Sequence, residues 1–203
     1  MGIDTVIKLH EQEVEAMRVI GGELRGKKLT APKDDSVRPT TDRVKESMFN
    51  LISGFIDGDT VVYDLFSGTG SLGIEALSRG AAKAFFCDKS RESYNITKEN
   101  ITNCRLNDRS KLVFGNYRKA VSEFEQKADL VFLDPPYGLD LWKDCSDMLV
   151  CQDKLNEEAV IVMEHGVENE LTGIHENLSL IKEKKYGAIV ISIYCYSAQS
   201  EEI

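Results

Sequence analysis

The segment Asp64–Gly73 constrains the fold of this chain more than any other, because its glycines stand between a strand pattern and a helix pattern. Residues 60–63 are β-branched or aromatic, as in a buried parallel strand. Residues 73–80 have helical spacing and end in a glycine, where a C-cap falls. The backbone amides of such a loop can approach the polar groups of a ligand. The glycines that match the G-x-G-x-x-G pattern are Gly68, Gly70 and Gly73.

Two aspartates indicate which ligand the loop binds. Asp88 follows the apolar run 84–87 and lies 20 residues after Gly68, where a carboxylate can accept both ribose hydroxyls of an adenosine-type ligand. Asp64 lies four residues before that glycine, and its carboxylate would repel a pyrophosphate and attract an ammonium group. The pattern therefore favours S-adenosylmethionine (SAM) over a nicotinamide cofactor. A tight strand-to-helix turn without a ligand is the alternative for the glycines alone.

The composition is that of a soluble globular protein of one domain. The chain has 203 residues, of which 42% are hydrophobic and 29% charged. No apolar run approaches the roughly 20 residues that span a bilayer, and no basic segment followed by an apolar one opens the chain, so we expect a cytoplasmic protein. Five cysteines without a C-x-x-C pair and three scattered histidines indicate neither a disulfide framework nor a metal site.

The net charge of −9 argues at first against a nucleic-acid partner, but the charge is unevenly distributed. Residues 17–45 hold eight basic and four acidic side chains, a local charge of +4, which leaves −13 for the rest of the chain. Such asymmetry suits a basic contact surface on an acidic catalytic body, and a solvated charged face is the plainer interpretation. The basic residues are Arg18, Arg25, Lys27, Lys28, Lys33, Arg38, Arg43 and Lys45.

The N-terminal part has three pieces. Residues 1–16 are polar and acidic, and we interpret them as a flexible tag or extension outside the fold. Residues 18–29 form two short alternating runs around Gly21-Gly22, which predicts a β-hairpin with basic outward positions. A helix with Thr40 or Thr41 as its N-cap follows. Its predicted buried face is Val44, Met48, Leu51 and Ile52.

Strand and helix patterns alternate through the rest of the chain. The predicted strands are 84–87, 111–114, 129–133 and 159–163, and the predicted helices are near 90–104, 117–126 and 140–149. This alternation requires right-handed crossovers and predicts an α/β fold with a parallel, doubly wound sheet. The end differs, because 178–184 and 189–196 predict an antiparallel hairpin. In such sheets ligands bind beyond the carboxyl ends of the strands. The polar residues that should gather there are Asp64, Asp88, Asn116 and Asp134.

The strand 129–133 runs into Asp134-Pro135-Pro136-Tyr137, a rigid loop because each proline fixes its own φ and restrains the residue before it. Asp134 and the Pro135 carbonyl can accept the two N–H donors of an exocyclic amino group, while the Tyr137 ring stacks on the base. This orients the nitrogen lone pair towards a methyl donor on the glycine loop, and Asp134 or water accepts the proton. The two loops together predict a SAM-dependent amino-group methyltransferase. A surface turn is the alternative for the tetrapeptide alone.

Residues 64–73, 88 and 134–137 resemble the amino-methyltransferase class of the seven-stranded SAM-dependent fold. Residues 17–29 and 38–50 further resemble the type D family of bacterial 16S rRNA guanine-N2 methyltransferases, and the match extends from Met17 to about Ser197. The resemblance implies a three-layer, Rossmann-like, doubly wound and mostly parallel seven-stranded sheet with an antiparallel C-terminal hairpin and a small N-terminal β-hairpin extension. It also implies methyl transfer from SAM to the N2 amino group of a guanine in 16S rRNA, within the small ribosomal subunit or an assembly intermediate. Nothing in the sequence demands more than a monomer, which we expect.

The resemblance also assigns roles by motif position. Gly68 and Gly70 would approach the amino-acid part of SAM, and Asp88 its ribose. Asn116, which stands where family members often carry an aspartate, would meet the adenine. The expected cofactor contacts are Asp64, Phe66, Ser67, Gly68, Thr69, Gly70, Asp88, Lys89, Asn116 and Tyr117. The expected catalytic loop is Asp134, Pro135, Pro136 and Tyr137. The expected RNA contacts are Arg18, Arg25, Lys27, Lys28, Arg38, Thr40 and Arg43. The chain then divides into the extension 1–16, a basic RNA-contacting hairpin and helix at 17–58, and a methyltransferase domain at 59–203.

Other functions stay open at this point. Asp-Pro-Pro-Tyr also suits the N6 amino group of adenine in DNA or a glutamine side chain in a protein. The absence of a separate base-recognition domain disfavours the DNA enzyme. An NAD-dependent dehydrogenase would leave Asp134 to Tyr137 without a role, and only that enzyme predicts NAD binding. A nonenzymatic RNA-binding module predicts RNA binding that SAM does not affect, and intact glycines and an intact Asp134 disfavour it.

Overall fold

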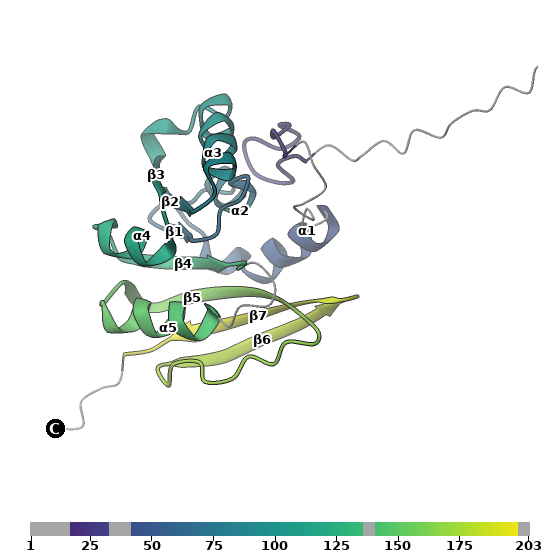
Figure 1. The fold of residues 1–203 in the computed structure, drawn as a ribbon. Helices are drawn as coiled ribbons and strands as arrows, with labels where there is room; N and C mark the ends of the chain where they lie inside the picture. Colours follow the sequence, from purple (N-terminus) through teal and green to yellow (C-terminus); the bar gives the residue numbers. More distant parts are fainter. Residues whose placement is uncertain (1–16, 33–41, 136–140, 199–203) are drawn as a thin grey trace, which may run out of the picture.

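The computed structural model describes residues 17–32, 42–135 and 141–198, which build one twisted sheet with helices on both faces (Figure 1). The strands are β1 (Val61–Asp64), β2 (Lys83–Asp88), β3 (Ser110–Phe114), β4 (Ala128–Leu133), β5 (Leu155–Gly166), β6 (Leu178–Tyr186) and β7 (Ile189–Tyr196). The helices are α1 (Asp42–Leu51), α2 (Ser71–Ser78), α3 (Arg91–Asn103), α4 (Tyr117–Glu123) and α5 (Leu141–Cys151), with short 3-10 turns η1 (Ser53–Phe55) and η2 (Asn107–Arg109).

The strand order is β3-β2-β1-β4-β5-β7-β6. Strands β1 to β5 are parallel, while β7 pairs antiparallel with both β5 and β6. The predicted fold class, a mostly parallel seven-stranded sheet that ends in an antiparallel hairpin, is confirmed. All five parallel strands end at one side of the sheet, which we call the carboxyl edge, and the order reverses between β1 and β4. Open α/β sheets bind ligands at such a reversal.

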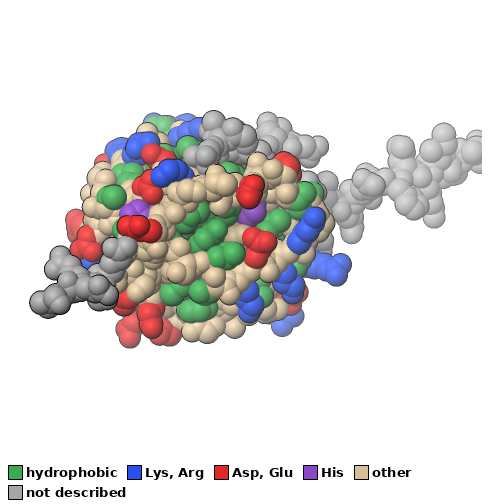
Figure 2. All heavy atoms as spheres, turned by 90° about the horizontal axis from the view of Figure 1, so that it is seen from below, with side chains coloured by type: hydrophobic (Ala, Val, Ile, Leu, Met, Phe, Trp, Pro, Cys, Tyr) green, Lys and Arg blue, Asp and Glu red, His purple; other side chains and the backbone are tan. Residues whose placement is uncertain are grey.

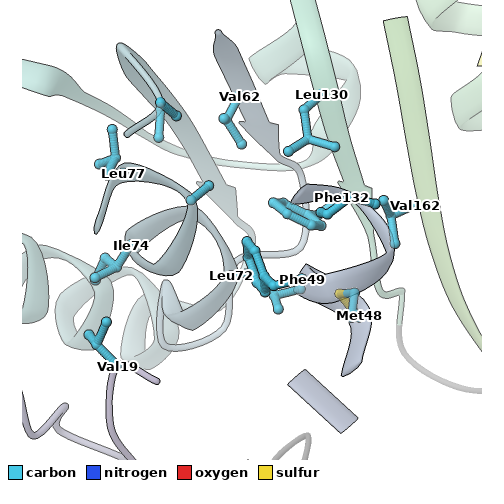
Figure 3. Close-up of a cluster of buried hydrophobic side chains, with 14 of the residues drawn as sticks. Val19, Met48, Phe49, Val62, Leu72, Ile74, Leu77, Leu130, Phe132 and Val162 are labelled. Atoms are coloured by element: carbon cyan, nitrogen blue, oxygen red, sulfur yellow. The ribbon is translucent and has the colours of Figure 1, made fainter. Parts of the chain in front are cut away.

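Each sheet face packs against its own set of helices. Val62, Leu130 and Phe132 lie in one buried cluster with residues of α1, α2 and α3. Figure 3 shows Phe49 of α1 in this cluster, with its ring centroid 5.6 Å from that of Phe132. Tyr63 belongs to a second cluster, on the opposite face, with residues of α4 and α5. This alternation along the strands is what a sheet covered on both faces requires.

Residues 17–32, which we call the N-terminal segment, form a short hairpin that is bonded to α2. The ends pair as expected, because Arg18 and Lys28 form an antiparallel bridge and Leu29 N–H donates to the Met17 carbonyl at 2.8 Å. Bonds between the two runs continue inside this bridge, where Val19 N–H donates to the Lys27 carbonyl at 2.9 Å and Gly26 N–H donates to the Val19 carbonyl at 2.8 Å. The turn is also bonded to α2, because Glu23 N–H donates to the Ser78 carbonyl at 2.8 Å. The extension 1–16 lies outside the described residues.

Other elements differ from prediction mainly at their ends. Helix α4 stops at Glu123 because Phe124 is extended, with φ −79° and ψ 123°, and its ring is buried in the second cluster. Strand β5 is longer than the predicted 159–163, because its second half pairs along β7 from Val160 to Gly166. Within the described residues, no helix has the length and apolar character that crossing a membrane requires.

Candidate functional site

The glycine loop has the geometry that its sequence predicts. Gly68 and Gly70 have φ values of +54° and +78°, a left-handed conformation that favours glycine. A Cβ on Gly68 would meet no atom within 4 Å, so the backbone there borders open space. A Cβ on Gly73 would lie 2.3 Å from Cε1 of Phe86. The first two glycines therefore shape a ligand-accessible turn, and the third lets α2 pack closely on β2.

Two aspartates hold the loop through its backbone. Asp64 Oδ2 accepts the N–H of Gly73 at 3.0 Å, and Asp88 Oδ2 accepts the N–H of Gly68 at 2.9 Å. The second oxygen of Asp88 accepts the N–H of Ser90 at 2.8 Å, at the start of α3. Each carboxylate oxygen has two acceptor positions, so these bonds leave Asp88 able to accept ligand hydroxyls as well.

Other loop residues are fixed by bonds to β2 and to α3. Ser67 N–H donates to the Cys87 carbonyl at 2.9 Å, and Thr97 Oγ1 donates to the Gly68 carbonyl at 3.0 Å. Thr69 is buried, and its carbonyl accepts from Asn100 Nδ2 at 2.9 Å. The loop is thus held in one conformation by the protein itself before any ligand binds.

The carboxylates at the carboxyl edge have raised pKa values. Burial, opposed by the bond from Gly73 and reinforced by the charge of Asp88, raises the pKa of Asp64 to about 7. Burial also raises the pKa of Asp88, against the bonds from Ser90 and Gly68. The pKa of Asp134 is raised well above its usual range by burial, then by the charges of Glu164 and Asp64. This edge therefore favours groups that donate hydrogen bonds or carry positive charge.

Asp134 and Pro135 follow β4 directly, beside the glycine loop. Phe132 pairs with Asp64 and Leu133 with Met163, so Asp134 lies at the end of β1 on one side and near Glu164 of β5 on the other. Pro135 is buried. Pro136 and Tyr137, the other predicted members of this loop, lie outside the described residues.

Glu164 is a site residue that the sequence analysis missed. Its side chain is buried near the end of β5, and its charge acts on Asp134. A usable signal exists in the sequence, because an acidic residue ends the apolar run 159–163 just as Asp64 and Asp134 end theirs.

The remaining predicted cofactor residues lie at the same edge in different environments. Asn116 is exposed and its Oδ1 caps α4 by accepting the N–H of Lys119 at 3.0 Å. Lys89 is exposed after β2. Phe66 is half-buried, with its ring 5.6 Å from that of Tyr117. Tyr117 is buried, and its hydroxyl bonds to Asp144 of α5, so any ligand contact by this residue uses its backbone or ring edge.

The predicted RNA contacts are mostly exposed. Arg18 is exposed and its Nε pairs with Asp42 at 2.8 Å. Arg38 and Thr40 lie outside the described residues. The other members, all exposed, are Arg25, Lys27, Lys28 and Arg43.

Lys45 corrects the predicted basic surface, because it is 1% exposed and cannot contribute to such a surface. Its Nζ donates to the Arg18 carbonyl at 2.6 Å and to Ser71 Oγ at 2.9 Å, and lies 3.6 Å from Glu75 Oε2. Burial lowers the pKa of Lys45, while the charges of Glu75 and Asp42 oppose this effect. The side chain therefore joins α1 to α2 and to the N-terminal segment.

Glu75 is the centre of this buried network and was also missed. It is fully buried in α2, and its two oxygens accept the N–H groups of Ile20 at 2.8 Å and Gly21 at 2.7 Å. Arg79 Nε donates to the same carboxylate at 2.8 Å. An acidic residue inside the otherwise apolar run 72–77 was the sequence signal. The N-terminal segment is thus fixed to the helix that follows the glycine loop.

The described part of the chain holds no group of three or more side chains with the composition of a metal site. The carboxyl edge of the sheet offers a turn at Gly68 that is open to a ligand, the carboxylate of Asp88 beside that turn, and the carboxylate of Asp134 after β4. This combination can hold an adenosine-type ligand with a cationic group next to a donor-rich planar substrate.

Comparisons with known proteins agree with this geometry. Residues 17–195 match the family model described as conserved hypothetical protein 95. The Escherichia coli (strain K12) protein named ribosomal RNA small subunit methyltransferase D is 35% identical over 185 residues, which cover 91% of this chain and 92% of that protein. The Bacillus subtilis (strain 168) protein named putative rRNA methyltransferase YlbH is 36% identical over 181 residues, which cover 88% and 98%.

The fold comparison gives the same result. The solved structure described as the putative methyltransferase yhhF from Escherichia coli superposes with a TM-score of 0.80 and 33% identity, over 91% of this chain and 99% of that one. The matched range begins at Met17 and includes the N-terminal segment, both loops of the site and the C-terminal hairpin. This chain therefore belongs to the conserved hypothetical protein 95 family, together with the small-subunit rRNA methyltransferases D.

Proposed function

We propose that this protein transfers a methyl group from SAM to the exocyclic N2 amino group of a guanine in 16S rRNA. The observation that carries the proposal is the position of Asp134 at the end of β4, adjacent to the Asp64 end of β1 and its glycine loop. A methyl donor on that loop and an amino group on Asp134 would be neighbours. Family membership with rRNA methyltransferases supports the same reaction.

The residues at the loop fit SAM. Open space beside Gly68 admits a ligand to the backbone, and Asp88 retains acceptor positions for ribose hydroxyls. The Asp64 carboxylate suits an ammonium group, because a nearby positive charge favours its ionised form. Asn116 donates from Nδ2 when its Oδ1 caps α4, and adenine ring nitrogens accept such donors. SAM supplies a methyl group that its sulfonium centre already activates.

The chain's own contribution to the reaction is alignment. Asp134 and the Pro135 carbonyl accept the two N–H donors of the amino group, and the proposed role of Tyr137 is to stack on the base. Holding the nitrogen lone pair towards the methyl donor converts a bimolecular encounter into an oriented one. Asp134 can accept a hydrogen bond in either protonation state, but it can accept the final proton only when it is ionised, and otherwise water accepts that proton.

The N-terminal segment and α1 are the proposed RNA-contacting part of the molecule, and residues from 59 onward the proposed methyltransferase domain. We propose the small ribosomal subunit or its assembly intermediate as the substrate, in the cytoplasm, with a monomer as the active form. The overall charge of −9 makes a local basic surface necessary for such a partner.

The test is methyl transfer from radiolabelled SAM to small subunits that lack rRNA modifications, followed by nuclease digestion and nucleoside identification. The expected product is N2-methylguanosine. Label in N6-methyladenosine would keep the chemistry and reject the guanine assignment. No label despite tight SAM binding would point to a protein glutamine, and binding of NAD instead of SAM would reject methyl transfer altogether.

A further inference from the structure

Strand β6 is an exposed edge strand that carries three lysines near the site. Lys182, Lys184 and Lys185 are all exposed. The strand ends at Tyr186, which pairs with Ile189 of β7, and Ile189 pairs with Gly166 at the end of β5. The turn between β6 and β7 therefore lies at the carboxyl edge, at the opposite end of the strand order from the strands that α2 and α3 cover (Figure 1).

The charges of β6 are separated between its two faces. Lys182 and Lys184 lie opposite Ile193 and Ile191, whose side chains belong to the cluster under α1. Glu183 points to the other face, where its Oε2 accepts from Ser192 Oγ at 3.0 Å. Figure 2 views the molecule from below. Lys and Arg side chains gather there on the right of the picture, the side on which Figure 1 has the β6–β7 turn. The α1 side of β6 is thus basic, without an acidic residue of the strand itself.

Helix α1 extends this surface. The Tyr186 hydroxyl and Ser47 Oγ of α1 form a hydrogen bond, so the end of β6 is fixed to the helix. Arg43 is exposed one turn before Ser47, at the i, i−4 position on the same helix face. Lys184 Nζ lies 5.4 Å from the centre of the Tyr186 ring, which directs its charge towards α1. We call Lys182 and Lys184 the hairpin surface. Arg43 follows Asp42, which pairs with Arg18, so this arginine belongs to the RNA-contacting part proposed above.

We propose that the hairpin surface is a second RNA-contact surface, which binds phosphates of the rRNA on the side of the site opposite the N-terminal segment. This inference rests on the proposed function. The N-terminal segment bonds to α2 and α3, over the β1–β3 half of the sheet, whereas β6 is the other edge. The carboxyl ends of β1 and β4, with Asp64 and Asp134, lie between them. An RNA strand bound at both surfaces would present its nucleotide to Asp134.

Charge complementarity favours RNA over a second copy of the chain. Lysines on an edge strand oppose pairing with another strand, which argues against β6 as a dimer interface. The same lysines suit phosphates, which bind ammonium groups as point charges. Because the whole chain carries −9, localised lysines at the carboxyl edge are what a polyanion can approach.

The test compares two double variants of the full chain that remove equal charge from opposite edges. Lys182→Ala/Lys184→Ala removes the proposed contact. Lys83→Ala/Lys127→Ala removes two exposed lysines at the starts of β2 and β4, away from the site. The probe is small subunits lacking rRNA modifications, with binding measured across a salt series. SAM affinity, thermal unfolding and size-exclusion elution are measured on each protein.

The plot of log affinity against log salt concentration should be shallower for the hairpin variant, by about one unit of slope per lysine removed. The loss of affinity relative to the wild type should therefore be roughly tenfold larger per lysine at about 0.1 M salt than at about 1 M. SAM affinity should not change, and the control variant should bind RNA like the wild type. If the hairpin variant and the control variant bind RNA with the same affinity and the same salt dependence, the inference is overturned. Self-association that is new in the hairpin variant would then show that these lysines prevent β6 from pairing with another strand. Wild-type protein that neither binds nor methylates the subunits would reject the proposed function instead.

Discussion

Asp88 Oδ2 accepts the backbone N–H of Gly68 at 2.9 Å, so the carboxylate proposed to bind ribose also fixes the first glycine of the loop. One side chain at the end of β2 thereby holds the turn that follows β1. The proposed cofactor site is built across two neighbouring strands, and its parts are positioned by the bonds of the protein itself.

Replacement of Asp88 by alanine should weaken SAM binding by about 1.5 to 3 kcal/mol per charged hydrogen bond lost. Calorimetric titration with SAM measures this directly. Asp153→Ala is the control, because Asp153 is exposed after α5 and pairs with Lys127, remote from the loop. An unchanged affinity in Asp88→Ala would remove this residue from the ribose site.

Replacement of Asp134 by asparagine should lower methyl transfer by at least about 10²-fold, the lower range for loss of a group that positions and accepts a proton. SAM affinity should be nearly that of the wild type, because the contact proposed for Asp134 is with the base rather than the cofactor. Single-turnover assays and a SAM titration on the same preparation separate the two effects. Parallel loss of cofactor affinity would contradict the assigned role.

The raised pKa of Asp64 predicts a stability change with pH. Its value of about 7 in the folded protein exceeds the ordinary 3.8, so between these values the folded state holds a proton that the unfolded state releases. The free energy of unfolding should therefore fall as pH rises from about 4 to about 7. Asp64→Asn, which keeps an acceptor for the Gly73 N–H, should show a flatter decline in urea unfolding at pH 5 and pH 8. If the free energy of unfolding falls equally in both proteins, Asp64 does not hold a proton in the folded state.

Replacement of Gly73 by alanine should destabilise the fold by roughly 1 to 3 kcal/mol, because its Cβ would lie 2.3 Å from the Phe86 ring. Chemical denaturation measures the change. Gly54→Ala is the matched control, since a Cβ there meets nothing within 4 Å and its effect should stay within about 0.5 kcal/mol. Phe86→Leu should restore part of the stability in the Gly73→Ala background. Equal stability of the two alanine variants would show that α2 and β2 are not closely packed at this point.

Glu75→Gln should destabilise by about 3 to 5 kcal/mol, as expected when one member of a buried charge network loses its charge. The amide keeps one oxygen acceptor and places N–H donors at the other position, so it faces either the Ile20 N–H or the Gly21 N–H and Arg79 Nε with a donor. Hydrogen exchange should show faster exchange of the Ile20 and Gly21 amides than in the wild type. Protection equal to that of the wild type would mean that other contacts hold the N-terminal segment.

Periodicity and glycine spacing were sufficient to predict the sheet, because local patterns and the handedness of crossovers determine this topology. The antiparallel pairing of β6 with β7 also followed from the two strand patterns around Gly187, which has φ +60° in the turn between them. The N-terminal hairpin was predicted too, but its attachment to α2 was not, since the bonds of its backbone to Glu75 and Ser78 are tertiary and leave no local signal.

At the site, the sequence predicted which residues reach the carboxyl edge but not what holds them. Asp64 and Asp88 each follow a strand pattern, and this position predicts that they lie at the carboxyl edge. No local pattern predicts the burial of Lys45, because a lysine in an amphipathic helix is exposed unless a distant carboxylate such as Glu75 faces it. Glu164 was missed because a single acidic residue in a strand has many structural explanations.

The central claim is that the glycine loop and Asp88 bind the adenosine cofactor beside Asp134, and the most direct test is a crystal structure with S-adenosylhomocysteine. The prediction is that both ribose hydroxyls lie within about 2.6 to 3.2 Å of the Asp88 carboxylate, with the amino-acid part over Gly68 and Gly70 and the sulfur facing Asp134. Ligand bound elsewhere, or with its ribose away from Asp88, would contradict the claim.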